Sequence, residues 1–357
     1  MRKMNEVSAV SNLCVGDVVE VRSKEEILRT LDRDGRLDGL PFMPEMLPWC
    51  GKRFRVFRRA HKTCDTIDNS GGRRMAGAVH LEDLDNGNSA QLRCDGAAHG
   101  ECQAGCLIFW KEAWLRPAGH ETDVEVTNVS GSGRLTNEED VWRSAATSEA
   151  DPTYSCQTTC LLDATSPLKW SNPGQYWEDY KSGNVGIRRM LMSFLFSVYN
   201  HLINAGVGLG VPLRWLYDRI QSLTGGVPYP HRPGLVPTGE STPTGVLNLQ
   251  PGELVRVKDY KAIRATLDCS SKNRGLYFDC EEVPFCGKTY KVIRKVDRII
   301  NEKTGKMMRF KATTVFLDGV WCQARFSEKR LFCPRAIYPM WREVWLERVV
   351  DQPASKK

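Results

Sequence analysis

The stretch VGDVVEVRSKEEILRTLD (15–32) returns later in the chain as PGELVRVKDYKAIRATLD (251–268), without a gap. At the same offset, GLPFMPEMLPWCGKRFRV (39–56) matches GLYFDCEEVPFCGKTYKV (275–292). Glycines, an aspartate and a Cys-Gly-Lys triplet recur at equivalent positions. So many ungapped identities are not expected by chance. The chain therefore contains an internal duplication.

Each copy predicts the same series of short elements. GDVVEVR and GELVRVK alternate apolar and polar residues, which is typical of a half-buried strand. Ser23 and Glu26 form a capping box that predicts a short helix through Leu31, and Asp259 is expected to cap the equivalent helix. CGKRFRVFRR and CGKTYKVIRK predict a strand after a Cys-Gly turn, and RRMAGAVHLED and MRFKATTVFLDG predict one more strand in each copy.

After unequal insertions the match resumes, with WKEAWL (110–115) facing WREVWLERV (341–349). Four or five short strands per hundred residues, opening with a Gly-acid-x-Val strand, resemble a small SH3-like barrel. The expected fold class is α+β, mainly β, with two homologous small SH3-like β-barrel repeats joined by a helical middle segment. The tandem Cys-Gly-Lys and Trp-x-x-x-Trp-Leu phrases also resemble an uncharacterised group of bacterial proteins, a resemblance that implies no activity.

Changes in composition predict the domain boundaries. The first β repeat is expected at 12–118 and the second at 248–350. Between them we expect a polar linker, a helical middle segment and a linker rich in Pro, Gly and Thr, at 119–153, 154–226 and 227–247.

The middle segment predicts two helices, at 188–204 and 212–223, broken by the glycine-rich sequence between them. No formal charge occurs from Met190 to Leu213, which nominally reaches the ~20 residues that span a bilayer. Polar residues, three glycines and Pro212 interrupt this run, so a buried or interfacial hairpin is favoured over a membrane span. Contact with another protein is the expected role of this segment, and peripheral membrane contact is the less favoured alternative.

The formal charge of +7 is spread along 357 residues. The basic strands at 55–62 and 291–298 are interpreted as solvated faces, and binding of single-stranded nucleic acid is the less favoured alternative. The first residues contain no continuous apolar segment, which predicts a cytoplasmic protein. In a reducing compartment, 13 cysteines favour metal ligands or buried thiols over disulfides.

The stretch RCDGAAHGECQAGC (93–106) carries three cysteines and a histidine on a glycine-rich background. Thiolates on a loop that can bend sharply are typical of a soft-metal site. The predicted ligands are four cysteines with two histidines as substitutes, namely Cys64, Cys94, Cys102, Cys106, His61 and His99. Zinc and an iron–sulfur cluster both suit this set, and the choice between them stays open.

Other cysteines and histidines have less specific patterns. Cys64 near His61, in a basic environment, is an alternative catalytic thiol. His80 alternates with apolar residues and is expected to be a hydrogen-bonded strand histidine. The second repeat has no histidine and no counterpart of Cys106. Its own thiols are therefore expected to pack beside aromatic residues rather than bind metal, namely Cys280, Cys286, Cys322 and Cys333.

These patterns favour a metal-binding accessory or scaffold protein of a bacterial biosynthetic or redox system. One alternative is a metal-dependent enzyme that uses the Cys/His site of the first repeat. The other is a module that binds single-stranded nucleic acid. The sequence has no phosphate loop, dinucleotide fingerprint or nucleophile elbow, so whether the chain is an enzyme stays open.

Overall fold

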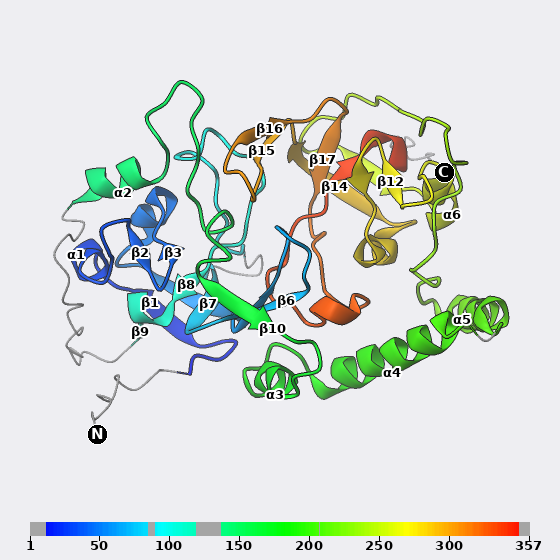
Figure 1. The fold of residues 1–357 in the computed structure, drawn as a ribbon, viewed down its shortest axis with the longest axis horizontal. Helices are drawn as coiled ribbons and strands as arrows, with labels where there is room; N and C mark the ends of the chain where they lie inside the picture. Colours follow the sequence, from blue (N-terminus) through cyan, green and yellow to red (C-terminus); the bar gives the residue numbers. More distant parts are fainter. Residues whose placement is uncertain (1–11, 85–89, 119–136, 207, 350–357) are drawn as a thin grey trace, which may run out of the picture. The chain divides into compact units, whose positions relative to one another are not determined.

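The structure, a computed structural model, describes residues 12–84, 90–118, 137–206 and 208–349 (Figure 1). Helices and strands contribute similar shares, so the chain is a mixed α/β protein with less strand than the sequence predicts. It divides into two compact units. The first contains the described residues up to Arg189 together with Ile299–Met308 and Phe332–Arg335, and the second contains the rest. The predicted domain boundaries stay predictions.

The first unit is built on a five-stranded antiparallel sheet. Its first strand lies between its second and its last, and the 3-10 helix η2 (Glu112–Trp114) joins the two edge strands. Among the described residues the sheet is open, because its edge strands do not pair. The strand order is β8 (Trp110–Lys111), β7 (Ala78–Glu82), β4 (Arg53–Arg59), β1 (Val18–Val21) and β9 (Leu115–Pro117).

The second unit has a five-stranded sheet of the same order, with η5 (Glu343–Trp345) in the place of η2. The registers also agree: Val19 faces Phe54 and Val255 faces Tyr290, each at the sequence offset of the repeat. The strands, in order, are β18 (Trp341–Arg342), β17 (Thr314–Leu317), β14 (Thr289–Lys295), β11 (Leu254–Val257) and β19 (Leu346–Arg348).

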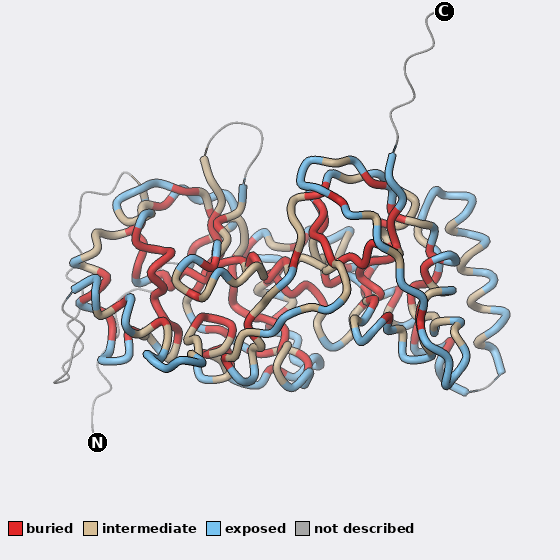
Figure 2. Tube along the Cα trace, turned by 90° about the horizontal axis from the view of Figure 1, so that it is seen from above, coloured by how far each residue is buried: buried red, intermediate tan, exposed pale blue. Residues whose placement is uncertain are grey.

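Both sheets cover a core with matching aromatic contacts. The Trp114 indole donates to Thr30 Oγ1 at 3.0 Å, and the Trp345 indole donates to Thr266 Oγ1 at 2.9 Å. In each unit a phenylalanine ring lies edge-on to that tryptophan. Because β1 and β11 alternate buried valines with more exposed residues, one face of each strand reaches this core, as the alternating sequence predicts. Figure 2 shows buried residues along the inner parts of the chain trace and exposed residues along its outer loops.

The short helices show where local prediction succeeds and fails. Helix α1 (Lys24–Leu28) begins with the predicted capping box of Ser23 and Glu26. Helix α6 (Tyr260–Arg264) begins after Asp259, but the Asp259 side chain makes no capping hydrogen bond, so that prediction is wrong. The single strand predicted from RRMAGAVHLED is also wrong, because Gly77 has a φ of 50° between strands β6 (Gly72–Met75) and β7.

Further elements surround the sheet of the first unit. A second sheet has the order β10 (Thr165–Leu168), β6, β5 (Lys62–Cys64), so part of the predicted middle segment pairs with the first repeat. Most of the hairpin of β15 (Arg298–Ile300) and β16 (Met307–Arg309) also belongs to this unit. The unit further contains β2 (Arg36–Leu37), β3 (Leu40–Pro41), η1 (Pro44–Trp49), α2 (Glu138–Ser144) and α3 (Gly174–Lys181).

The two predicted helices of the middle segment are confirmed as α4 (Ile187–Asn204) and α5 (Gly210–Thr224). No described helix is both long enough and apolar enough to cross a bilayer. The first part of the predicted linker, 119–136, lies outside the described residues. The second unit also contains β12 (Lys272–Asn273), β13 (Leu276–Tyr277), η3 (Cys280–Phe285) and η4 (Glu328–Arg330).

Candidate metal centre

The cysteine-rich stretch forms a tight loop in the first unit. The loop is closed at its base where Cys94 donates its backbone N–H to the carbonyl of Cys106 at 2.9 Å. Gly96 has a φ of 79°, and a Cβ there would lie 2.1 Å from the carbonyl oxygen of Cys102. The loop can therefore fold back on itself only because this position is glycine.

Three metal-ligand side chains meet beside this loop. The ligand atoms of Glu45, Cys94 and His99 all lie within 4.8 Å of one another. Cys94 and His99 come from the loop, and Glu45 comes from η1, whose first turn begins at Pro44. The Glu45 and His99 side chains are only 2% and 1% exposed, so water does not compete freely for their polar atoms.

His99 is held by acceptors on both sides of its ring. Its Nδ1 lies 2.6 Å from Glu45 Oε1, and its Nε2 lies 3.2 Å from the carbonyl oxygen of Ser155. A metal-bound histidine usually donates its second ring N–H to a carbonyl or a carboxylate. Coordination through Nδ1 would leave the Ser155 carbonyl in that supporting role.

One oxygen of the Glu45 carboxylate accepts hydrogen bonds, and the other has no hydrogen-bond partner. Oε1 accepts from the backbone N–H of Ala98 at 3.0 Å as well as from His99, whereas Oε2 is buried without a hydrogen-bond partner. Burial acts to raise the pKa of Glu45, but the hydrogen bond and charge of His99 outweigh it, and the pKa falls below its ordinary value of 4.5. Glu45 is therefore a carboxylate at neutral pH, and one of its oxygens has no hydrogen-bond partner.

The Cys94 thiol differs from Glu45 in its protonation. Burial, and next the nearby Glu45 carboxylate, raise its pKa well above the ordinary value. Without a cation the sulfur therefore keeps its proton at neutral pH. Since a thiolate is the form that binds metal, binding at this site would release that proton.

The other predicted ligands lie in different surroundings. Cys102 Sγ accepts a hydrogen bond from the backbone N–H of Ile300 at 3.3 Å. Burial raises the pKa of Cys106 to about 12, against the charge of Arg335. Arg335 also donates to the carbonyl of Cys64 at 3.4 Å. Within the described ranges, Glu45, Cys94 and His99 are the only three such residues whose ligand atoms are gathered, so the four predicted thiolates do not form one group.

His61 belongs to a separate buried network. Its Nε2 lies 3.3 Å from Asp179 Oδ1, and Lys62 Nζ lies 2.6 Å from Asp179 Oδ2. Burial, and next the Lys62 charge, lower the pKa of His61 to about 3, while burial raises the pKa of Asp179 to about 6. A neutral His61 beside an ion pair ties β5 to α3. His80, as predicted, is a buried strand histidine, with Nδ1 2.8 Å from the carbonyl of Ile108.

Sequence analysis overlooked Glu45, although the duplication carries a signal for it. Glu45 and Glu281 occupy equivalent positions in PFMPEML, which is otherwise apolar, and in YFDCEEV, which also contains Asp279 and Glu282. Both side chains lie in 3-10 helices and both are buried. A carboxylate repeated inside an apolar turn indicates a buried acid that needs a specific partner.

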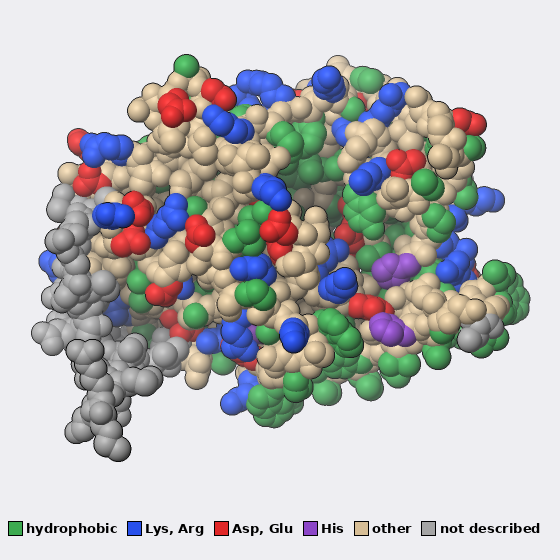
Figure 3. All heavy atoms as spheres, viewed as in Figure 1, with side chains coloured by type: hydrophobic (Ala, Val, Ile, Leu, Met, Phe, Trp, Pro, Cys, Tyr) green, Lys and Arg blue, Asp and Glu red, His purple; other side chains and the backbone are tan. Residues whose placement is uncertain are grey.

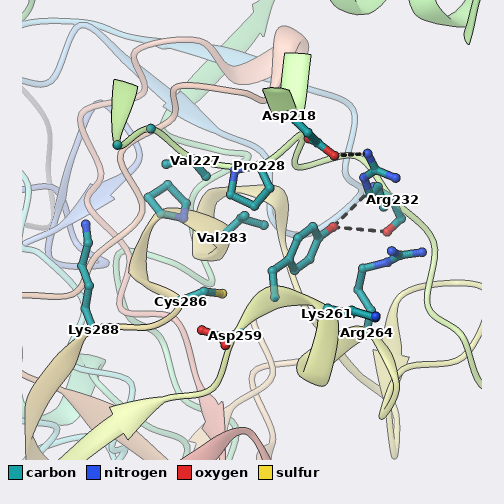
Figure 4. A pocket seen from close by; sticks show the side chains of 14 residues that line it. Asp218, Val227, Pro228, Arg232, Asp259, Lys261, Arg264, Val283, Cys286 and Lys288 are labelled. Carbon is teal, nitrogen blue, oxygen red and sulfur yellow. Dashed lines mark hydrogen bonds and ion pairs between the residues drawn. The ribbon is translucent and has the colours of Figure 1, made fainter. Parts of the chain in front are cut away.

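The second unit contains a cavity of about 480 Å³ (Figure 4). Arg232, which pairs with Asp218, lies at one side of it, and Lys261, Arg264 and Lys288 add three further cations. This lining suits an anion rather than a metal ion. The equivalent corner of the first unit differs, because there Lys24 pairs with Glu138 of α2 at 2.5 Å.

Comparison of the chain with family models, with curated proteins and with solved structures finds no match.

Proposed function

We propose that this chain is a zinc-binding accessory or scaffold protein, in which Glu45, Cys94 and His99 hold one Zn²⁺ ion. The observation that carries the proposal is the meeting of these three ligand atoms within 4.8 Å, in a buried place where Glu45 Oε2 has no other partner. Mixed sulfur, nitrogen and oxygen ligands suit zinc, whereas an iron–sulfur cluster needs several cysteines at one point.

A structural role for the ion follows from the burial of its ligands. Catalytic zinc sites have three protein ligands and leave the fourth position to water, whereas here the Glu45 and His99 side chains are almost fully enclosed, and the second Glu45 oxygen, Oε2, would fill the fourth position. The ion would fasten the glycine-rich loop at 94–106 to η1. Glycines lower the stability of an ordered loop, so this loop gains most from such a link. This favours an accessory role over the alternative of a metal-dependent enzyme.

The test is zinc content, measured by elemental analysis of the full chain after exposure to excess zinc and dialysis. We expect one equivalent in the wild type and in Cys102→Ser, because Cys102 lies in the same loop but faces the Ile300 amide. Cys94→Ser and His99→Ala should lose most of the zinc while circular dichroism reports an unchanged fold. Zinc retained in both variants, or none in the wild type, contradicts the proposal.

We also infer that the two five-stranded sheets are two copies of one SH3-like barrel, and that each copy is open at one edge. Three features support this inference: the first strand lies between the second and the last, a 3-10 helix separates the last two strands, and both sheets have an irregularity at the same place. An experimental structure in which residues 15–57 and 251–293 fold differently would contradict it.

A further inference from the structure

Helix α4 is apolar on its outer side as well as on its inner side. Its inner side is buried and includes Met190, Phe196 and Ile203. The opposite side carries four aliphatic residues that follow one another at intervals of four, three and four, which places them in one stripe. Each is more than half exposed: Leu191 58%, Leu195 56%, Val198 62% and Leu202 53%.

Helix α5 extends this exposed apolar surface. None of its residues is buried. Val211, Trp215 and Leu223 are 77%, 65% and 76% exposed. Figure 3 shows hydrophobic side chains gathered along the edge where α4 and α5 lie. Contiguous apolar surface on two consecutive helices is rare on soluble monomers and marks a docking face.

The exposed charges on these two helices are mainly cationic. Helix α4 contains no Asp or Glu, and its second residue, Arg188, is exposed. On α5, Arg219 is exposed, whereas the single carboxylate, Asp218, is paired with Arg232. The face is therefore mainly apolar, with two exposed cations: Arg188 in the first turn of α4, and Arg219, which lies on the apolar side of α5 one turn from both Trp215 and Leu223.

The breadth of the face distinguishes a lipid surface from a partner helix. A helix that docks in a coiled coil flanks a narrow apolar seam with charged residues. Here Met192, at 60% exposure, lies beside the stripe of α4, and α5 adds a second apolar side. A wide apolar face with Trp215 and arginines is typical of helices that lie in the plane of a membrane interface.

We propose that α4 and α5 dock together on the surface of an anionic lipid bilayer, with their exposed apolar residues among the acyl chains and Arg188 and Arg219 at the headgroups. The helices would lie along the surface, since neither is able to span the bilayer. This inference is independent of the zinc site, which lies in the first unit.

The test is co-sedimentation of the full chain with vesicles. One set is phosphatidylcholine alone, and the other contains phosphatidylcholine and phosphatidylserine at roughly three to one. We expect clear binding to the mixed vesicles and weaker binding to the neutral ones. Leu195→Glu should weaken binding at least about tenfold. It removes an apolar side chain that the bilayer would bury, and it adds a negative charge that the anionic headgroups repel. Arg219→Gln should lower the preference for phosphatidylserine.

The matched control is Val246→Glu, which changes an exposed valine (75%) of the same unit outside these helices and should leave binding unchanged. Val198→Ser replaces Leu195→Glu if the latter melts at a lower temperature than the wild type. Absence of vesicle binding by the wild type overturns the proposal. So does a concentration-dependent dimer in sedimentation equilibrium that Leu195→Glu abolishes while vesicle binding persists, because that result assigns the face to a second copy of the chain.

Discussion

Glu45 and Glu281 occupy equivalent positions in the two copies, but different groups surround them. Glu281 accepts from the backbone N–H groups of Arg325, Phe326 and Ser327 at 2.8, 2.6 and 3.0 Å, and both of its oxygens are used. Glu45 meets one backbone N–H and the His99 ring, and one oxygen has no partner. The same buried acid thus has both oxygens hydrogen-bonded in one copy and one oxygen without a hydrogen-bond partner in the other.

The electrostatic consequence is opposite in the two copies. Burial raises the pKa of Glu281 more than its backbone hydrogen bonds lower it, so the net pKa is raised. Burial also acts on Glu45, but His99 adds a hydrogen bond and a charge, and the net pKa is lowered. One histidine, present only in the first repeat, therefore accounts for the difference between the raised pKa of Glu281 and the lowered pKa of Glu45.

The largest expected effect comes from replacing each acid by its amide. Without zinc, Glu281→Gln should destabilise the second unit by about 3 kcal/mol, because the new NH₂ group faces backbone N–H donors. Glu45→Gln should cost less, about 1 kcal/mol, since its amide nitrogen can occupy the position of the unpartnered Oε2. The measurement is the opening free energy of each unit by hydrogen exchange.

Zinc separates the two variants further. Added zinc should raise the opening free energy of the first unit in the wild type and in Glu281→Gln, but not in Glu45→Gln, which lacks a charged ligand. An equal response to zinc in both variants would remove the distinction between the two carboxylates.

A second prediction concerns pH and follows from the raised pKa of Glu281. A carboxyl group whose pKa is higher in the folded chain favours folding while it is protonated. Its contribution is complete below the ordinary value of 4.5 and is lost as the pH rises through the folded value. The opening free energy of wild type relative to Glu281→Gln should therefore fall as the pH rises from below 4.5. A difference that grows with pH in this window refutes the assignment.

The sequence predicts the repeated elements because each rests on local patterns. Alternating valines predicted β1 and β11, the Ser23 box predicted α1, and the apolar runs predicted α4 and α5. The glycine-rich loop also indicated two of the three candidate ligands, Cys94 and His99, since its bends and its donors are adjacent in the chain.

What the sequence could not give are the contacts made by distant segments. Ile299–Met308 and Phe332–Arg335 belong to the first unit. There the backbone N–H of Ile300 donates a hydrogen bond to Cys102 Sγ, and the charge of Arg335 acts on Cys106. Nothing near these cysteines in the chain indicates such partners. Glu45 was missed for the same reason, because its nearest ligand neighbour is 49 residues away along the sequence.

A third prediction uses a contact that both copies share. Thr30→Val and Thr266→Val each remove the acceptor of a tryptophan indole N–H and a donor to a backbone carbonyl. Each should lower the stability of its own unit by about 2 kcal/mol, because buried polar groups lose their partners. Thr→Ser at either site is the control, since it keeps the hydroxyl. If the two variants lose different amounts of stability, the shared threonine–tryptophan contact does not contribute equally to the two units, despite its similar geometry.

The smallest expected difference lies at the start of the first helix of each copy. Ser23 accepts from the backbone N–H of Glu26, and the Glu26 side chain accepts from the Ser23 backbone N–H, so two helix-end donors are satisfied. Asp259 holds the equivalent place without such a bond, and its carboxylate lies 3.8 Å from the Arg256 guanidinium. Ser23→Ala should therefore lower the opening free energy of the first unit by about 1 kcal/mol, whereas Asp259→Ala should leave that of the second unit nearly unchanged.

The reverse substitution, Asp259→Ser, sharpens the comparison. Position 262 is alanine, which cannot return a capping-box bond, so serine alone should stabilise α6 by less than Ser23 stabilises α1. Hydrogen exchange of the amides in the first turns of α1 and α6 measures both effects. Equal protection lost in Ser23→Ala and Asp259→Ala would mean that Asp259 caps its helix in solution after all.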